Sequence, residues 1–381
     1  MNDLLRARPQ VLIARSLLVI GALLVVAACG SATGASTSTT EPSTAQPTAA
    51  AATPTPPPPP PLAVLQASVP SDIHVVDSTG HTQWSLTDTA ARTLLSLGPN
   101  DGVEVRPAGV NLFVFGCHDS ATTALPGGVA VLDSTGKVIG KGAFDKATTC
   151  GDVAADPSGP RWAWSVDDSL PATPGVQHHG RIMVAGLGTA ARSVYSWLAP
   201  VDASERVGAW TDMGIVMQRL TFGGCGPGFH PDTASFLINP SKETLSDLFD
   251  GASYLDARHG VRVSLAAGSH SAILVDGARF DYPATIIDGA YVSPDGALVG
   301  VGRLTPLPCA GGDQSARVHT QLITVATGAQ VELPGCEIRG WFDAGHFVCQ
   351  QFTDPTSFVE DLSGHMSATL GKGNFLGVLQ Q

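Results

Sequence analysis

The chain lacks the motifs of the common enzyme classes. It has no Gly-x-Ser-x-Gly nucleophile turn, no phosphate-binding loop and no paired carboxylates in an identifiable context. No two cysteines have the Cys-x-x-Cys spacing that zinc and redox sites favour. Charged residues make up only 14% of the chain, whereas glycine is abundant, which favours strands and turns over helices. We therefore predict an all-β protein without a cofactor, and we expect binding more than catalysis.

The chain also lacks an apolar run long enough to cross a membrane. Its longest such run, Leu17 to Ala28, falls short of the roughly 20 residues that a membrane-spanning helix needs. Three arginines, Arg6, Arg8 and Arg15, precede it. A positive segment followed by a short apolar run is typical of a secretory signal peptide, which we predict for residues 1–28.

The run ends in the sequence Val26-Ala27-Ala28-Cys29-Gly30. This sequence resembles the bacterial lipobox, in which an aliphatic residue and two small residues precede the lipidated cysteine. The resemblance implies that Cys29 carries diacylglycerol, and often a further acyl chain on its freed amine. Two or three acyl chains bind a membrane far more firmly than one. We therefore expect a lipoprotein anchored through Cys29 to the cell membrane, with its folded part on the extracytoplasmic side.

Residues 29–62 consist almost entirely of Ser, Thr, Ala, Gly and Pro and end in a run of prolines. Such a composition cannot bury a core, so we predict a disordered tether that its prolines stiffen near the end. No second linker divides residues 63–381, which we predict to form one domain. Without the signal peptide the net charge is −14, from 18 basic and 32 acidic residues. A surface this acidic disfavours nucleic acid as a partner.

Two kinds of hairpin alternate along this domain. The first kind joins two apolar strands through a turn containing Pro, Asp or Gly. It occurs at Glu104 to Phe115, Val153 to Val166, Gly208 to Gln218, Ser253 to Leu265, Gly289 to Val301 and Gly340 to Gln350. The second kind carries a turn like Asp-Ser-Thr-Gly. It occurs at Val75 to Gly80, Val131 to Gly136, Ile323 to Gly328 and Phe358 to Gly364, with weaker copies around Gly188, Asn239 and Asp276.

Paired hairpins that repeat about every 50 residues indicate four-stranded units arranged radially. The turn Ser293-Pro294-Asp295-Gly296, followed by Ala297 to Val301, resembles the first turn of blades in TolB-like and WD-repeat propellers. The resemblance implies a β-propeller. A surplus N-terminal hairpin, Ile73 to Leu86, and a lone terminal strand, Asn374 to Leu379, predict seven blades closed by both termini, with six or eight as alternatives.

In such a blade the strands A to D run antiparallel, so the A–B and C–D turns share one face and the B–C and D–A connections share the other. The long connections, Gly116 to Gly128, Asp167 to Gly180, Leu220 to Thr233 and Arg303 to His319, all fall on the second face. Long loops on a rigid scaffold are where binding groups usually lie. The candidate ligand-binding residues on this face are His118, Asp119, His178, His179, His230, Asp232, Asp313 and His319.

Six cysteines remain after Cys29, and an even number in an exported protein predicts disulfides. They are Cys117, Cys150, Cys225, Cys309, Cys336 and Cys349. Sequence alone allows 15 pairings, but the predicted strand order favours three of them. These are Cys336–Cys349, Cys117–Cys150 and Cys225–Cys309.

Two functions are compatible with these features. The first is a lipoprotein whose disulfide-stapled, loop-rich face binds a protein, peptide or glycan of the cell envelope. The alternative is a propeller hydrolase or lyase with a metal at the central mouth, held by residues such as His118 and His230. The tryptophans Trp162, Trp164, Trp210 and Trp341 are expected to pack in the core or between blades.

Overall fold

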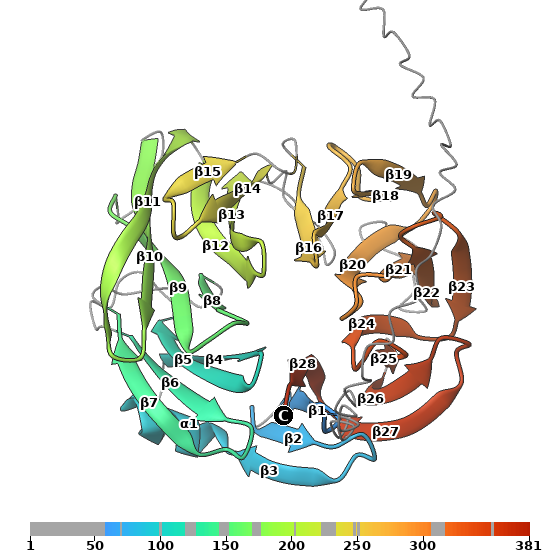
Figure 1. The fold of residues 1–381 in the computed structure, drawn as a ribbon, viewed down its shortest axis with the longest axis horizontal. Coiled ribbons are helices and arrows are strands. Elements are labelled where there is room, and N and C mark those ends of the chain that lie inside the picture. Colours follow the sequence, from blue (N-terminus) through green and yellow to red (C-terminus); the bar gives the residue numbers. More distant parts are fainter. Residues whose placement is uncertain are drawn as a thin grey trace, which may run out of the picture. The chain divides into compact units, whose positions relative to one another are not determined.

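The computed structural model describes residues 58–68, 71–98, 101–118, 127–144, 152–169, 177–201, 203–221, 234–246, 249, 252–305, 317–351 and 354–381. These residues form seven four-stranded antiparallel sheets and one helix. The sheets stand side by side in a ring, each with one strand at the centre and one at the rim (Figure 1). This confirms the predicted seven-bladed β-propeller.

Six blades are continuous in the chain, and their strands follow sequence order from A at the centre to D at the rim. The first three are β4 (Asp101–Ala108), β5 (Asn111–His118), β6 (Gly128–Asp133) and β7 (Val138–Ala143); β8 (Val153–Ala155), β9 (Arg161–Asp167), β10 (Gln177–Gly186) and β11 (Thr189–Val201); and β12 (Ala203–Thr211), β13 (Gly214–Thr221), β14 (Ala234–Asn239) and β15 (Thr244–Ser246). The next three are β16 (Tyr254–Arg258), β17 (Val261–Leu265), β18 (Ala272–Val275) and β19 (Ala278–Asp281); β20 (Ile286–Val292), β21 (Leu298–Thr305), β22 (Arg317–Thr324) and β23 (Gln330–Pro334); and β24 (Glu337–Trp341), β25 (His346–Gln351), β26 (Asp354–Asp361) and β27 (Met366–Lys372).

The seventh blade joins the two ends of the described chain. Its order is β28 (Asn374–Leu379), β1 (Leu62–Gln66), β2 (Ile73–Val76) and β3 (Thr82–Leu86). Strand β28 pairs antiparallel with β1, with Ala63 opposite Val378. The predicted closure by both termini is therefore confirmed. Strand β1 was not anticipated, although Pro70, Ser71 and Asp72 between it and β2 are residues typical of a hairpin turn.

The single described helix, α1 (Asp88–Leu95), follows the closing blade and was also not anticipated. Thr87 caps its start, since the Thr87 hydroxyl accepts a hydrogen bond from the Ala90 amide. It has eight residues, and within the described ranges no helix has the length and hydropathy of a membrane span.

The second kind of hairpin turn has the local chemistry that its sequence indicates. Asp77 Oδ1 accepts hydrogen bonds from the amides of Thr79 at 2.9 Å and His81 at 3.1 Å. Asp133 repeats the pattern with Thr135 and Lys137 at the same distances. The glycine of each turn adopts a positive φ, 83° at Gly80 and 82° at Gly136, which glycine tolerates without strain.

Large apolar side chains fill the space between blades. Trp162, Trp164, Trp210 and Trp341 are all buried, which confirms their predicted packing role. Trp341 also donates its indole N–H to the Tyr291 carbonyl at 2.8 Å, and thereby joins β24 to β20. Neighbouring blades are thus held by apolar packing together with directed hydrogen bonds.

Fully buried hydroxyls on C strands add a second inter-blade connection. Ser235 on β14 accepts from the Tyr254 amide at 2.8 Å, and Thr320 on β22 accepts from the Ile338 amide at 3.0 Å. Ser357 on β26 donates to the Gly373 carbonyl at 2.9 Å, just before β28. In each case a C strand is hydrogen-bonded to the beginning of the inner strand of the next blade. These bonds fix the position of each blade along the ring axis relative to its neighbour.

Candidate functional site

The long connections lie between B and C strands, as the strand order predicted. They join β5 to β6, β9 to β10, β13 to β14 and β21 to β22. Of the candidate ligand-binding residues, Asp119, His230, Asp232 and Asp313 lie outside the described residues, and so does the side chain of His118. The role of this face therefore stays a prediction.

The three described candidate histidines lie on two different blades. On β10, the Nδ1 atom of His178 is 3.2 Å from Asp167 Oδ2, while His179 is exposed. On β22, Nδ1 of His319 is 2.9 Å from a carboxylate oxygen of Glu332. Among the described residues no group suited to metal binding includes any of these histidines.

A cavity of about 570 Å³ lies at the centre of the ring. The inner strands of all seven blades line it, and so do residues of the A–B turns, including Gly109, Asp212, His259 and Pro294. The cavity therefore lies toward the end of the inner strands opposite to the long B–C connections. Its volume is in the range of small-ligand pockets, roughly 300 to 1,000 Å³.

The cavity wall carries charges of both signs beside aromatic rings. Cationic side chains come from Arg106, Arg258 and Arg339, and acidic ones from Asp212 and Asp256. The aromatic members are Tyr254, Tyr291, Trp210, Trp341 and Phe375. A wall of this kind can hydrogen-bond a polar ligand while it packs against the apolar parts of the same ligand.

Asp256 fixes one side of this wall. One of its carboxylate oxygens accepts from the Val292 amide at 2.7 Å, and the other accepts from the Ala257 amide at 2.8 Å. The first bond connects β16 to β20. Burial raises the pKa of Asp256 and also raises the pKa of Tyr254, whose hydroxyl lies 3.5 Å from the carboxylate. The backbone amides of Val292 and Ala257 therefore hold the Asp256 side chain in a fixed position.

Arg339 connects the cavity to a pair of acids, the buried Glu337 and the half-buried Asp288. Its guanidinium donates to Asp288 at 2.8 Å and to Glu337 at 3.0 Å, so that it bridges β20 and β24. Burial, together with a hydrogen bond to Asp288, raises the pKa of Glu337 to about 9. One guanidinium balances one carboxylate, and the second acid therefore keeps its proton at neutral pH. Gly302 provides the space for Glu337, because a Cβ there would lie 3.2 Å from Glu337 Cγ.

Sequence reasoning missed Asp256, Asp288 and Glu337. Each is an acidic residue on an inner strand, where mostly apolar residues are expected, and that was the signal available in the sequence. The repeat predicts that these three strands are successive inner strands, but it does not show that their acidic side chains and Arg339 meet, so the cluster was not predictable from the sequence.

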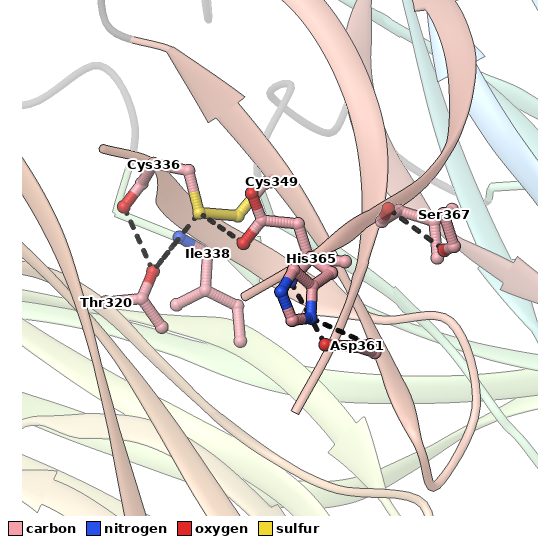
Figure 2. Close-up of a disulfide and its surroundings, with 9 residues drawn as sticks. Thr320, Cys336, Ile338, Cys349, Asp361, His365 and Ser367 are labelled. Carbon is pink, nitrogen blue, oxygen red and sulfur yellow. Dashed lines mark hydrogen bonds and ion pairs between the residues drawn. A yellow bond between two sulfur atoms is a disulfide. The ribbon is translucent and has the colours of Figure 1, made fainter. Parts of the chain in front are cut away.

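Polar side chains also lie beside a disulfide. Cys336 and Cys349 are bonded to each other, as predicted, and join the start of β24 to β25. Figure 2 shows the bond with the Thr320 hydroxyl beside Cys336. Cys150, Cys225 and Cys309, and the side chain of Cys117, lie outside the described residues, so the other two disulfides stay predictions.

No protein-family model and no curated protein matches the chain. Among solved structures, the β-propeller domain of the trilobed protease from Pyrococcus furiosus is similar, with 11% identity and a TM-score of 0.45 over 73% of this chain and 85% of that one. A prolyl endopeptidase has 13% identity and a TM-score of 0.46 over 82% of this chain and 50% of its own. The Synechocystis apocarotenoid oxygenase has 12% identity and a TM-score of 0.39 over 84% and 74%. These likenesses concern the propeller architecture alone.

Proposed function

We propose that the protein is a lipid-anchored binding protein of the cell envelope. The signal peptide and lipobox would place it at the membrane through Cys29, on the extracytoplasmic side, with the residues from Cys29 to the start of β1 as a tether. Its central cavity would hold a peptide or a glycan, presented by a molecule of the envelope. The observation that carries this proposal is a cavity of about 570 Å³ to which every blade contributes.

The chemistry of the cavity supports a polar chain as the ligand. Peptides and glycans both present hydrogen-bonding groups along apolar segments. Arg258 and Asp212 offer a donor and an acceptor, and Tyr254 and Phe375 offer ring surface. The bonds Asp256 to Val292 and Arg339 to Asp288 hold this wall in place before a ligand arrives, which lowers the entropic cost of binding.

The test is calorimetric titration of the purified protein with two probes, the peptide and the glycan pools of an enzymatic digest of bacterial cell envelope. We expect one pool to bind. Leu376→Trp, which fills the cavity from β28, should abolish the binding, because Leu376 lines the cavity. Leu362→Trp is the matched control, since Leu362 is exposed on the turn between β26 and β27. Equal binding by both variants, or no binding of either pool by the unmodified protein, would refute the proposal.

A further inference from the structure

The disulfide Cys336–Cys349 has a buried carboxyl group beside it. Glu360 Oε2 lies 3.3 Å from Cys336 Sγ, and the two sulfurs and a Glu360 oxygen all lie within 4.8 Å of one another. Cys336 is 1% exposed, Cys349 0% and Glu360 8%. Burial raises the pKa of the Glu360 carboxyl, and the neighbouring Asp361 carboxylate raises it further.

A cavity borders the Glu360 side of this group. A second cavity, of about 390 Å³, is lined by Glu360 together with Gly335, which directly precedes Cys336. Its other walls come from Gln351, Thr356, Phe358, Met366 and Thr369. This cavity is distinct from the central one, because the two have no lining residue in common.

From this arrangement we propose that reduction of the Cys336–Cys349 bond creates a binding site for a thiophilic divalent cation such as Zn²⁺. The ligands would be the two thiolate sulfurs and a carboxylate oxygen of Glu360, with water from the adjacent cavity in the fourth position. A dithiol reductant would supply two electrons and two protons, so that the S–S bond becomes two thiols while the dithiol becomes a disulfide. Binding of the cation then releases both thiol protons.

The geometry is compatible with a tetrahedral cation. Zinc–sulfur bonds of about 2.3 Å place two sulfur ligands roughly 3.8 Å apart. The Cα atoms of Cys336 and Cys349 are 5.6 Å apart, so rotation of the freed side chains can reach that separation without movement of the strands. The Thr320 hydroxyl lies 3.8 Å from Cys336 Sγ and donates to the Cys336 carbonyl at 3.1 Å, so it holds the backbone that carries this ligand (Figure 2).

A disulfide that only stabilises the fold would not account for the buried acid beside it. The bond spans only 13 residues, within a hairpin whose strands already pair, with Ile338 opposite Cys349. Closing so short a loop stabilises a fold less than closing a long one. A disulfide that only stabilises the fold also needs no acid beside its sulfurs. Burying the Glu360 carboxylate without a cation is unfavourable. A bound divalent cation would balance that carboxylate.

The experiment uses Co²⁺ as a spectroscopic probe in place of Zn²⁺, on the full chain reduced with a phosphine. We expect thiolate-to-cobalt charge-transfer absorption in the reduced protein, its loss on addition of Zn²⁺, and none in the oxidised protein. Cys336→Ser combined with Cys349→Ser should lower the bound cobalt by one equivalent, which separates this site from the remaining cysteines. Glu360→Gln should weaken cobalt binding by at least about tenfold. Asp361→Asn is the matched control, because Asp361 is the next residue and carries the same charge on a more exposed side chain.

The proposal is overturned if the reduced protein gives no such absorption, or if the double cysteine variant keeps the full cobalt stoichiometry. Equal affinities of Glu360→Gln and Asp361→Asn would overturn it as well. That comparison decides the matter even if the double variant does not fold, since both cysteines remain in it. The outcome is independent of the central cavity, because Leu376→Trp should bind cobalt like the unmodified protein.

Discussion

The hydroxyl of Thr320 accepts a hydrogen bond from the backbone amide of Ile338 at 3.0 Å, across the boundary between two blades. Both groups are buried. We predict that Thr320→Val, which keeps the shape and removes the acceptor, lowers the free energy of unfolding by about 1 to 3 kcal/mol, because it leaves a buried N–H without a partner. The measurement is the denaturant midpoint. Thr82→Val, on the exposed outer strand β3, serves as the control. Equal midpoints for the two variants would show that the inter-blade bond contributes nothing.

Ring closure depends on β28. Deleting residues 374–381 should leave the inner edge of β1 unpaired and expose its apolar residues, such as Val64. Exposed strand edges of this kind aggregate. We therefore expect a marked fall in melting temperature, together with aggregation seen by light scattering. A truncated protein that melts at the temperature of the full chain would contradict closure by both termini.

The membrane anchor can be tested by one substitution. Cys29→Ala removes the thiol that would carry lipid, and the tether has no apolar segment to replace it. We expect the variant to leave the membrane fraction of the producing cells. If the variant remains in the membrane pellet after a salt wash, the lipoprotein interpretation is wrong.

The pair of acids at Arg339 should make stability depend on pH. The raised pKa of Glu337 means that the folded protein keeps a proton that the unfolded chain loses above its ordinary pKa of 4.5. Stability is therefore expected to fall as pH rises from about 5 toward 9, by at most about 1.4 kcal/mol per pH unit. Glu337→Gln cannot ionise and should remove much of this fall.

Melting temperature recorded across that pH range tests the assignment. Glu243→Gln is the control, because Glu243 is an exposed acid that forms a surface ion pair with Arg192. It should leave the slope unchanged. A Glu337→Gln protein with the same slope as the unmodified protein would show that the acid is ionised in the fold.

Peptide mapping without reduction tests the remaining disulfides. We expect Cys336 linked to Cys349, as in the structure, together with Cys117–Cys150 and Cys225–Cys309. The Cys336–Cys349 link spans 13 residues, for which the chain-entropy estimate is about 3 kcal/mol. A link between Cys225 and any cysteine other than Cys309 would contradict the predicted arrangement of the long connections.

Local signals predicted much of the fold because each depends on a few adjacent residues. Asp133 and Gly136 determine a tight turn through their own hydrogen bond and φ angle. The repeat of such turns then determined strand number and order, since antiparallel strands joined by tight turns must be neighbours. Strand β1 and helix α1 carry weaker local signals, the residues Pro70 to Asp72 after the strand and Thr87 before the helix, and neither belongs to the hairpin repeat. The pairing of Ala63 with Val378 and the cap at Thr87 define them in the structure.

The sequence by itself determined the seven-bladed ring, its closure by both termini and the pairing of Cys336 with Cys349. Local turn chemistry and strand alternation suffice for these features. Only the tertiary structure decided where the polar groups meet. Asp288 and Arg339 are 51 residues apart and form an ion pair because β20 and β24 are adjacent inner strands. Glu360 reaches Cys336 because β26 and β24 lie in one sheet. Such meetings depend on the distance between strands in the ring, which no local pattern in the sequence specifies.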